Sequence, residues 1–516
     1  MTANRETPSR TAAWAGPGPR AWSRCRRQVE PAFMHQGSMP RARRLWSCVA
    51  ALALAACATP FDNAPLNVPL SPPSTPAFFA QSGSPLPPDP RGGANVIALS
   101  LSGGGMRAAA FAFGVLQALQ GGGSTGIDVF DELTFISSVS GGSLTAAYFG
   151  LHGREGFADF RGRVLDQDFE RELRMSMLSP INISRLLAGG LNDRSNLAHT
   201  LHREVFGQAT FAQLQRRGKP EVWINASDLY NRTPFPFIPP VFLGLCSDLS
   251  QFHVADAVAA SMAVPLVFAP IVLQTHPDRC LTPLPTWALP EAQRQAAQAG
   301  QAGQGVVRAV AQALRNYRDA SRMRYVKLVD GGITDNNGLS SILIARAVSG
   351  TPYGPLEEGA AVRARRILFL VVDAGRPPAG EWAKQQDGPS GVEVALAAAD
   401  TAVDSATRLG ADAFARMVDD WRASIIRFRC SLSPEQLRRH LPQGLPAGAP
   451  WRCDDLQFEV GVIGFDNLEG ARADRLKNMQ TRLVLPKADI DEAIAAGRDA
   501  TRDSPAMGRY LSGRVR

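Results

Sequence analysis

An apolar, β-branched run from Thr134 to Val139 stops abruptly at Ser140, and two glycines and then a helical pattern follow it. This order predicts a strand, a sharp turn and a helix, with the serine at the turn. Such a turn would hold the serine hydroxyl out of a sheet, near the positive end of the helix dipole. A strand-to-helix turn rich in Gly and Ser is more often ordinary loop chemistry, so this run alone does not make Ser140 a nucleophile.

A second strand-to-helix turn carries three consecutive glycines. The buried strand expected over Val96–Leu101 runs into Gly103, Gly104 and Gly105, and Arg107 follows them. Three glycines in this place leave main-chain N–H groups free to point at one anion. A phosphate-binding P-loop would need Gly-Lys-Ser/Thr and a dinucleotide site would need Gly-x-Gly-x-x-Gly, and neither pattern is present. The glycines therefore predict an oxyanion hole, with Arg107 holding the loop or binding a phosphate of the substrate. The alternative is a tight turn followed by a surface arginine.

A third strand, expected over Tyr325–Asp330, ends in a carboxylate that Gly331 and Gly332 follow. An Asp at the carboxyl end of a strand lies at the same edge of an α/β sheet as the other two turns. Its oxygens could take the proton of Ser140 directly, without a histidine between them. Asp373 also ends an apolar strand and is the alternative carboxylate, but it lacks the Asp-Gly-Gly turn that allows close approach of the backbone.

The seven histidines lie outside these three motifs. A Ser-His-Asp triad stays open, because its members need not be near in sequence, but none of the histidines follows a predicted strand. His199 and His202 are three residues apart and would suit a metal pair, although a solvated helix face explains them as well. No metal or other cofactor is expected, since a covalent nucleophile needs none and the chain has no calcium-loop pattern of acidic residues.

The order Gly-Gly-Gly-x-Arg, then Ser140 in its turn, then Asp330-Gly331-Gly332 resembles the patatin-like phospholipases. Two more segments are similar to that family: Trp223–Leu229 looks like its central strand, and Ala260–Pro265 looks like its Ala-Ser-x-Ala-x-Pro block. The resemblance covers about residues 94–375. It implies an α/β fold of three layers, α/β/α, with a mainly parallel central sheet.

The same resemblance implies a serine acyl hydrolase with a Ser-Asp dyad. Carried over to this chain, Ser140 is the nucleophile, Asp330 is the dyad acid, and Gly103 to Gly105 form the oxyanion loop. The family's turn usually begins with glycine, whereas this chain has Ser138 there. We therefore expect cleavage of carboxylic ester bonds in phospholipids or related acyl lipids. The alternatives are a general esterase or lysophospholipase, and a catalytically silent, lipid-binding lipoprotein of the envelope.

The N-terminal residues predict where in the cell the protein is located. From Met39 the chain has three arginines, an apolar run over Leu45–Ala56 and then Cys57. Twelve apolar residues are too few for a membrane-spanning helix of about 20, but they suit a signal peptide. Leu-Ala-Ala-Cys57 resembles the lipobox of bacterial lipoproteins, in which the cysteine is lipidated. Residues 1–57 are thus interpreted as a mis-assigned start plus a lipoprotein signal peptide.

Ala58 follows the cysteine, which favours an outer-membrane lipoprotein of the bacterial cell envelope, facing the periplasm or the surface. An ordinary cleaved signal with a free periplasmic product is the alternative. Residues 1–57 contain nine arginines, no lysine and two glutamates, so 46 basic and 45 acidic residues remain in the mature chain. A near-neutral protein gives no reason to expect a nucleic-acid partner. The expected partners are a lipid substrate and, through the N-terminal lipid anchor, a membrane surface.

The mature chain holds Cys246, Cys280, Cys430 and Cys453. An even number of cysteines in an oxidising compartment suggests two disulfides, and nearest-neighbour pairing would join Cys246 to Cys280 and Cys430 to Cys453. Three connectivities are possible, and buried free thiols also stay open. The oligomeric state is not predicted.

Strands alternate with helices over most of the chain, which favours one catalytic domain over residues 94–516, with insertions near residues 160–202 and 281–322. Residues 58–93 hold 10 of the 38 prolines and are interpreted as an extended tether. The proline-broken apolar run Pro234–Leu243 suits neither a helix nor a central strand. It either touches lipid, lines an acyl pocket or packs inside the domain.

Overall fold

The computed structural model describes residues 63–71, 95–121, 128–174, 180–216, 220–298, 304–377, 380–441 and 451–512. The predicted signal peptide and Cys57 lie outside these residues. Thr59–Arg516 clusters as one unit, and the elements below all belong to it. Within the described residues, every helix is too short or too polar to cross a bilayer.

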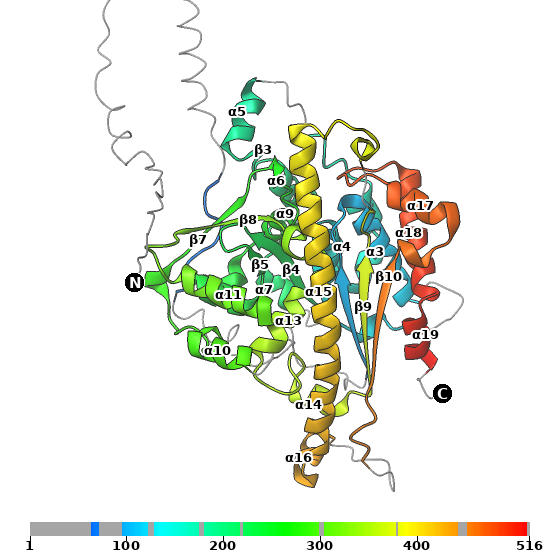
Figure 1. Cartoon of the computed structure of the whole chain (residues 1–516). Helices are drawn as coiled ribbons and strands as arrows, with labels where there is room; N and C mark the ends of the chain where they lie inside the picture. Colours follow the sequence, from blue (N-terminus) through cyan, green and yellow to red (C-terminus); the bar gives the residue numbers. More distant parts are fainter. Residues whose placement is uncertain are drawn as a thin grey trace, which may run out of the picture. The chain divides into compact units, whose positions relative to one another are not determined.

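An eight-stranded sheet forms the centre of the fold (Figure 1). Its order is β10-β9-β1-β2-β4-β8-β7, and β5 also pairs with β4, outside this order. The strands are β1 (Asn95–Leu101), β2 (Leu133–Val139), β4 (Glu221–Asp228), β5 (Thr233–Pro236), β7 (Ile271–Gln274), β8 (Tyr325–Asp330), β9 (Arg366–Asp373) and β10 (Gln457–Gly464). A separate two-stranded sheet pairs β3 (Gly190–Asn192) with β6 (Leu266–Phe268).

Five strands of the central sheet, β10, β9, β1, β2 and β4, run parallel to their neighbours. Every residue of β2 is buried, and so is every residue of β1 except its first. Burial on both faces explains why β1 and β2 consist mostly of apolar and small residues and do not alternate between apolar and charged ones. The prediction of an α/β fold with a mainly parallel sheet is confirmed. The other half of the sheet differs, because β5 and β8 pair antiparallel with β4, and β7 pairs antiparallel with β8.

Helices cover both faces of the sheet. On β4 the Val222 side chain faces α4 (Gly141–His152), because a Cβ at Gly150 would lie 2.5 Å from it. Successive side chains of a strand point to opposite faces, so Trp223 faces the other side. There Trp223 stacks on Phe135, with ring centroids 4.8 Å apart. In the same layer, Phe369 of β9 lies 4.5 Å from Phe414 of α15 (Gly391–Cys430). The predicted three-layer arrangement is therefore present.

The α4 layer also contains α3 (Gly105–Leu119) and α18 (Lys487–Arg502), which pack on each other. On the opposite face, α15 is a 40-residue helix that begins at a capping box formed by Ser390 and Glu393. The remaining α-helices in the described parts are α5 (Pro180–Ala188), α6 (Leu197–Leu201), α7 (Phe211–Arg216), α8 (Pro239–Leu245), α9 (Val254–Ser261), α10 (Pro290–Gln298), α11 (Gln304–Tyr317), α12 (Gly332–Asp335), α13 (Ser340–Val348), α14 (Glu358–Arg363), α16 (Pro434–His440), α17 (Gly470–Asn478) and α19 (Pro505–Ser512).

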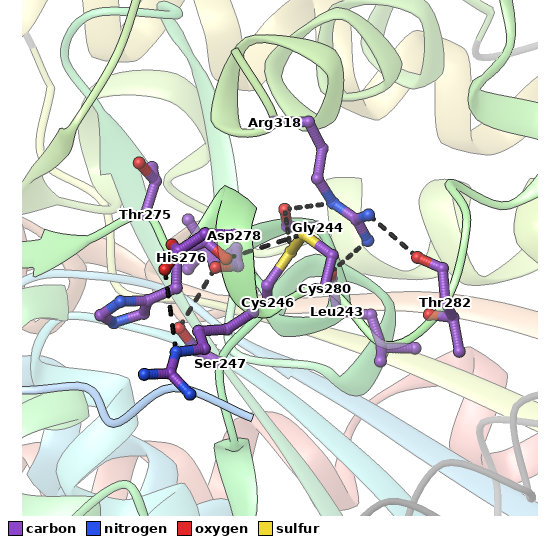
Figure 2. The surroundings of a disulfide bond; sticks show 12 residues. Leu243, Gly244, Cys246, Ser247, Thr275, His276, Asp278, Cys280, Thr282 and Arg318 are labelled. Atoms are coloured by element: carbon purple, nitrogen blue, oxygen red, sulfur yellow. Dashed lines mark hydrogen bonds and ion pairs between the residues drawn. A yellow bond between two sulfur atoms is a disulfide. The ribbon is translucent and has the colours of Figure 1, made fainter. Parts of the chain in front are cut away.

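Two disulfides join Cys246 to Cys280 and Cys430 to Cys453, so the nearest-neighbour pairing is confirmed. Figure 2 shows the first of them at the end of α8. Arg318 lies beside it and donates hydrogen bonds to the carbonyls of Leu243 and Gly244, at 2.8 and 3.0 Å. A cation is favourable there, because the last carbonyls of a helix have no partner within the helix. Since Arg318 lies in the segment predicted as an insertion near 281–322, it fixes that segment to the body.

The described part of the predicted tether, residues 63–71, does not stand away from the body. The Leu70 amide donates to the carbonyl of Cys246 at 2.9 Å, and the Leu70 side chain is buried against the disulfide. The Asn67 side chain donates to the Ser247 hydroxyl at 2.6 Å. This part of the tether is bound because its unpaired main-chain and amide groups find partners beside α8.

The structure of the proline-broken run Pro234–Leu243 also differs from the prediction. It forms part of β5 and most of α8, and Phe235, Phe237 and Phe242 are each at most 1 % exposed. The prolines fit because they occupy a strand with one partner, at positions 234 and 236, and the start of a helix, where no amide donor is needed. Its aromatic side chains pack inside the domain, so the lipid-contacting alternative is wrong.

Candidate active site

Ser140 lies between the end of β2 and the start of α4, with φ 48° and ψ −122°. A positive φ is rare for a residue with a side chain, and such strain is typical of functional positions. A Cβ at Gly141 would overlap the carbonyl oxygen of Gly105, and one at Gly142 would lie 2.7 Å from that of Leu101. The small residues that the sequence shows at this turn are therefore required by the close approach of the glycine-rich loop.

A buried serine, Ser261, holds the turn in place. Its hydroxyl accepts a hydrogen bond from the Ser140 amide at 2.8 Å and donates to the carbonyl of Asn225 at 2.6 Å. Ser138, which stands where the family has glycine, donates to the carbonyl of Trp223 at 3.2 Å. The serine hydroxyl at this position is therefore accommodated by a carbonyl of the neighbouring strand.

The Ser140 hydroxyl donates a hydrogen bond to Oδ2 of Asp330 at 2.8 Å. The other carboxylate oxygen, Oδ1, accepts from the amide of Gly332 at 2.8 Å. Asp330 is 8 % exposed, and this burial raises its pKa to about 6, although both hydrogen bonds oppose the shift. A carboxyl group with this pKa is ionised at neutral pH and is still a better proton acceptor than an ordinary Asp.

Asp330 reaches Ser140 by a route that the sequence reasoning did not foresee. We expected the carboxyl ends of parallel strands to meet at one edge, but β8 runs antiparallel to β4. In the strand register Val139 pairs with Asn225, and Asp330 pairs with Ala226. The last residue of β2 and the last residue of β8 are thus one residue apart along β4. This follows because β8 approaches from beyond the C-terminal end of β4 and ends beside Ser140.

The Ala260–Pro265 segment positions both sides of this contact. The amide of Asp330 donates to the carbonyl of Ala263 at 2.9 Å, and the amide of Gly331 donates to that of Ser261 at 3.2 Å. Ser261 therefore connects the Ser140 turn to the Asp330 turn. Sequence reasoning assigned this segment only by resemblance and missed the role of Ser261. The available signal was one polar residue at the end of an apolar helix pattern.

The glycine-rich loop lies against Ser140, since a Cβ at Gly103 would lie 3.3 Å from the Ser140 Cβ. The predicted set of oxyanion donors needs one correction. The Gly103 amide donates to the carbonyl of Asn336 at 3.0 Å, so it is already engaged. In the parts of the chain that the structure describes, the amides of Gly104 and Gly105 have no such acceptor. Gly104 caps α3 and Gly105 begins it, so both amides belong to the positive end of a helix dipole.

Arg107 is buried and its guanidinium is engaged by main-chain carbonyls, which differs from the substrate-binding role predicted for it. Its side chain is 1 % exposed and donates from Nε and Nη2 to the carbonyl of Ala374, at 3.2 and 2.8 Å. It also donates to the carbonyl of Met479. Burial lowers its pKa to about 10. Arg107 therefore ties the glycine-rich loop to the chain after β9, which is the loop-holding role also considered for it.

The alternative groups lie elsewhere. Asp373 ends β9, which is separated from β2 by β1, and its carboxylate accepts from the amide of Gly375 at 2.8 Å. His202 lies 3.3 Å from the carboxylate of Asp256, whose hydrogen bond raises the histidine pKa. Neither side chain contacts Ser140, since the hydroxyl of Ser140 is directed at Asp330.

Residues 99–343 match the family model described as "Patatin-like phospholipase". A comparison with curated proteins gave no match. Among solved structures, the chain is similar to human GIVD cytosolic phospholipase A2, with 12% identity and a TM-score of 0.33 over 86% of this chain and 67% of that chain. It is also similar to VipD from Legionella pneumophila, with 12% identity and a TM-score of 0.29 over 81% of this chain and 67% of that chain.

At these TM-scores the solved structures do not bear on the function of this chain, whereas the family model spans Ser140, Asp330 and the glycine-rich loop. The chain therefore carries a patatin-like phospholipase domain over residues 99–343, the domain of a lipid acyl hydrolase.

Proposed function

We propose that the protein hydrolyses carboxylic ester bonds of phospholipids or related acyl lipids, with Ser140 as nucleophile and Asp330 as general base. The observation that supports this assignment is the 2.8 Å hydrogen bond from the Ser140 hydroxyl to Asp330. A serine hydroxyl is a weak nucleophile unless an adjacent base takes its proton. Here the carboxylate occupies the place of that base without an intervening histidine.

In the first half of the reaction, the Ser140 oxygen attacks the acyl carbonyl and its proton passes to Oδ2 of Asp330. The carbonyl oxygen becomes negatively charged, and the amides of Gly104 and Gly105 stabilise it at the start of α3. The tetrahedral intermediate then collapses, and the ester bond to the alcohol breaks. Asp330 returns its proton to the leaving alcohol, and the acyl group stays on Ser140.

In the second half, water attacks the acyl-enzyme. Asp330 accepts a proton from the water, the same amides stabilise the new oxyanion, and the fatty acid leaves as the Ser140 hydroxyl takes the proton back. The raised pKa of Asp330, about 6, suits both directions of proton transfer, because the group must accept and release one proton in each half of the reaction.

The site of action proposed is the bacterial envelope, with the protein anchored as an outer-membrane lipoprotein through Cys57. Support comes from the lipobox-like sequence and from the two disulfides, which form and persist in oxidising compartments. Fractionation of cells that produce the wild type or Cys57→Ser tests this. The anchored wild type should stay with outer membranes through an alkaline wash that strips peripheral proteins, and the variant should be released by that wash. A wild type found in the soluble fraction contradicts the anchor.

Hydrolysis of phospholipid vesicles tests the proposed chemistry. Ser140→Ala and Asp330→Asn should release fatty acid at least about 100-fold more slowly than the wild type, whereas Asp373→Asn should stay within a few-fold. A panel of esters with short and long acyl chains separates a lipid hydrolase from a general esterase. If the folded wild type hydrolyses none of these esters, the proposal fails and a silent lipid-binding protein is favoured.

A further inference from the structure

Helix α5 (Pro180–Ala188) buries polar side chains and exposes apolar ones, which is the opposite of an ordinary surface helix. Two of its polar side chains are buried, with Asn182 9 % exposed and Arg185 5 % exposed. Two of its apolar side chains face outward, with Ile183 46 % exposed and Leu187 84 % exposed. A surface helix normally directs its apolar stripe at the core and its charges at water. This reversed orientation requires contacts that hold the polar face of α5 and a partner that covers its apolar face.

The polar face is held by specific contacts. Arg185 donates from Nη2 to the carboxylate of Asp193 at 2.7 Å and from Nε to the carbonyl of Leu191 at 2.9 Å. The Asp193 side chain is 3 % exposed, so this ion pair is fully buried. A buried charge is tolerated only when it is paired and hydrogen-bonded. Rotating α5 to hide Leu187 would break the pair, so the outward direction of the apolar side chains is fixed.

Helix α5 is connected to the candidate active site. Gly190, at the start of β3 just after α5, pairs with Leu266 of β6. Leu266 is three residues after Ala263, whose carbonyl accepts the Asp330 amide at 2.9 Å. Each residue of chain spans at most about 3.6 Å and paired strands lie about 5 Å apart, so the end of α5 is within about 30 Å of Asp330. In Figure 1, α5 lies at the top, the end toward which the arrow of β9 points.

The short chain between the site and β6 is itself apolar and partly exposed. Val264 is 39 % exposed, and Pro265 to Val267 are half-buried. Leu266 has φ 71°, a strained value for a bulky residue. A run of apolar residues thus leads from the residues that hold Asp330 to β6, whose partner strand β3 follows α5 in the chain.

The charges around α5 favour an anionic surface as its partner. The carboxylates before and after it are engaged, since Glu172 pairs with Arg203 at 3.0 Å and Asp193 pairs with Arg185. Arg174 is exposed and lies beside β3, because its amide donates to the Asn192 side chain at 2.7 Å. The single charged residue of α5 is the buried Arg185, so its outward face is uncharged. An apolar face with a cation beside it fits the surface of a membrane that contains acidic lipids.

We propose that α5 is an interfacial docking helix, which inserts Leu187 and Ile183 into the lipid surface that holds the substrate. This inference rests on the proposed function in that both place an acyl lipid at the same end of the molecule. Docking at α5 would bring this end of the molecule to the membrane, so that an acyl chain passes along Val264 and Leu266 toward Ser140. Lipid anchoring at Cys57 would keep the protein near a membrane, whereas α5 would set its orientation.

A local fluorescence experiment tests the docking without using catalysis. Cys25, Cys48 and Cys57 are replaced by serine in the full chain, and Leu187→Cys or Leu289→Cys is added and labelled with the environment-sensitive dye NBD. Leu289 is a matched control, since it is exposed (40 %) and lies before α10, away from α5 in Figure 1. On addition of phosphatidylethanolamine–phosphatidylglycerol vesicles, NBD emission at position 187 should rise at least twofold and shift to the blue, and emission at position 289 should not change.

Two results would overturn the proposal. One is that the label at position 187 behaves like the label at 289 while the protein sediments with the vesicles, because the chain then binds lipid through another part. The other is that emission at position 187 rises with protein concentration in the absence of vesicles, because the apolar face then covers a second copy of the chain. Neither result depends on whether the protein has esterase activity.

An activity ratio links the docking to the reaction. Leu187→Asp should lower the ratio of the rate on phospholipid vesicles to the rate on a monomeric short-chain ester by about tenfold or more, relative to Leu289→Asp. An unchanged ratio contradicts docking at α5, while turnover of both substrates leaves the proposed function standing. If the wild type turns over neither substrate but the label at position 187 reports insertion, the proposed function fails and the docking helix stands.

Discussion

Replacing Asp330 by asparagine should make the protein more stable while it abolishes activity. Asparagine has nearly the shape of aspartate. Its Oδ1 can still accept from the Gly332 amide, and its Nδ2 can donate to the Ser140 hydroxyl, which accepts as well as donates. The substitution therefore keeps the packing and both hydrogen-bond positions. It removes the negative charge, and with it the group that accepts the serine proton.

The size of the stabilisation follows from the pKa. Burial raises the pKa of Asp330 from an ordinary 3.8 to about 6 in the folded protein. Each pKa unit corresponds to about 1.4 kcal/mol, so ionising the carboxylate in the folded state costs roughly 3 kcal/mol. The folded pKa is above the unfolded one, so this cost is fully present above pH about 6 and is absent below pH about 4. The asparagine side chain has no proton to lose, so the variant avoids the cost at every pH.

Urea unfolding at several pH values measures this effect. At pH 8 the free energy of unfolding of Asp330→Asn should exceed that of the wild type by about 3 kcal/mol, and the difference should fall toward zero near pH 4. Ser140→Ala provides the contrast. It removes a hydrogen-bond donor from the ionised carboxylate and should lower the stability at pH 8 by about 1 to 2 kcal/mol. Both variants should be inactive, but their stabilities should change in opposite directions.

Equal stability of Asp330→Asn and wild type at pH 8, or a difference that does not depend on pH, would refute this reasoning. The carboxylate would then be either solvated or protonated in the resting protein, and in neither case would it be a strained base beside Ser140. A buried, ionised carboxylate that lowers stability is expected only where function requires it.

Three further predictions address the rest of the site and the fold. First, kcat/KM should rise with pH through about 6 and then level off, because Asp330 must be ionised to accept the proton; a wild-type profile flat from pH 4.5 to about 8 contradicts this. Second, Arg107→Met should destabilise the protein by about 3 kcal/mol, because it leaves buried carbonyls without donors, and should slow hydrolysis of anionic and zwitterionic lipids by the same factor; a selective loss on anionic lipids would restore a substrate-binding role. Third, replacing Cys246 and Cys280 together by serine should destabilise the protein by about 4 kcal/mol, as expected for a cross-link between residues 34 apart, and should speed hydrogen exchange at Leu70; an unchanged denaturation midpoint contradicts it.

The strand-to-helix turns could be predicted from sequence because their physics is local. A buried parallel strand needs a continuous apolar run, and the turns at Ser140 and Gly103 need small residues at adjacent positions. The pairing of Ser140 with Asp330 was suggested by the order of motifs. The antiparallel direction of β8 was not predictable, because it depends on which strand pairs with β4 across about 100 intervening residues.

The residues that the sequence analysis missed act through tertiary contacts. Ser261 is one serine among many until the fold brings its hydroxyl to the Ser140 amide. The burial of Arg107 was not predictable, because arginines are usually exposed and the carbonyls of Ala374 and Met479 come from segments more than 260 residues away. The reversed orientation of α5 depends on the ion pair with Asp193. Because Asp193 lies outside the helix, the amphipathic pattern of α5 alone does not show which face is buried.

The most direct test of the central claim is to locate the site of covalent modification by a long-chain fluorophosphonate, which phosphonylates an activated serine. Peptide mapping by mass spectrometry should find one adduct per chain, on Ser140, and Asp330→Asn should form it at least about 100-fold more slowly while it remains folded. Modification of a different serine, or an equal rate in the two proteins, would show that Asp330 does not activate Ser140 and would contradict the account.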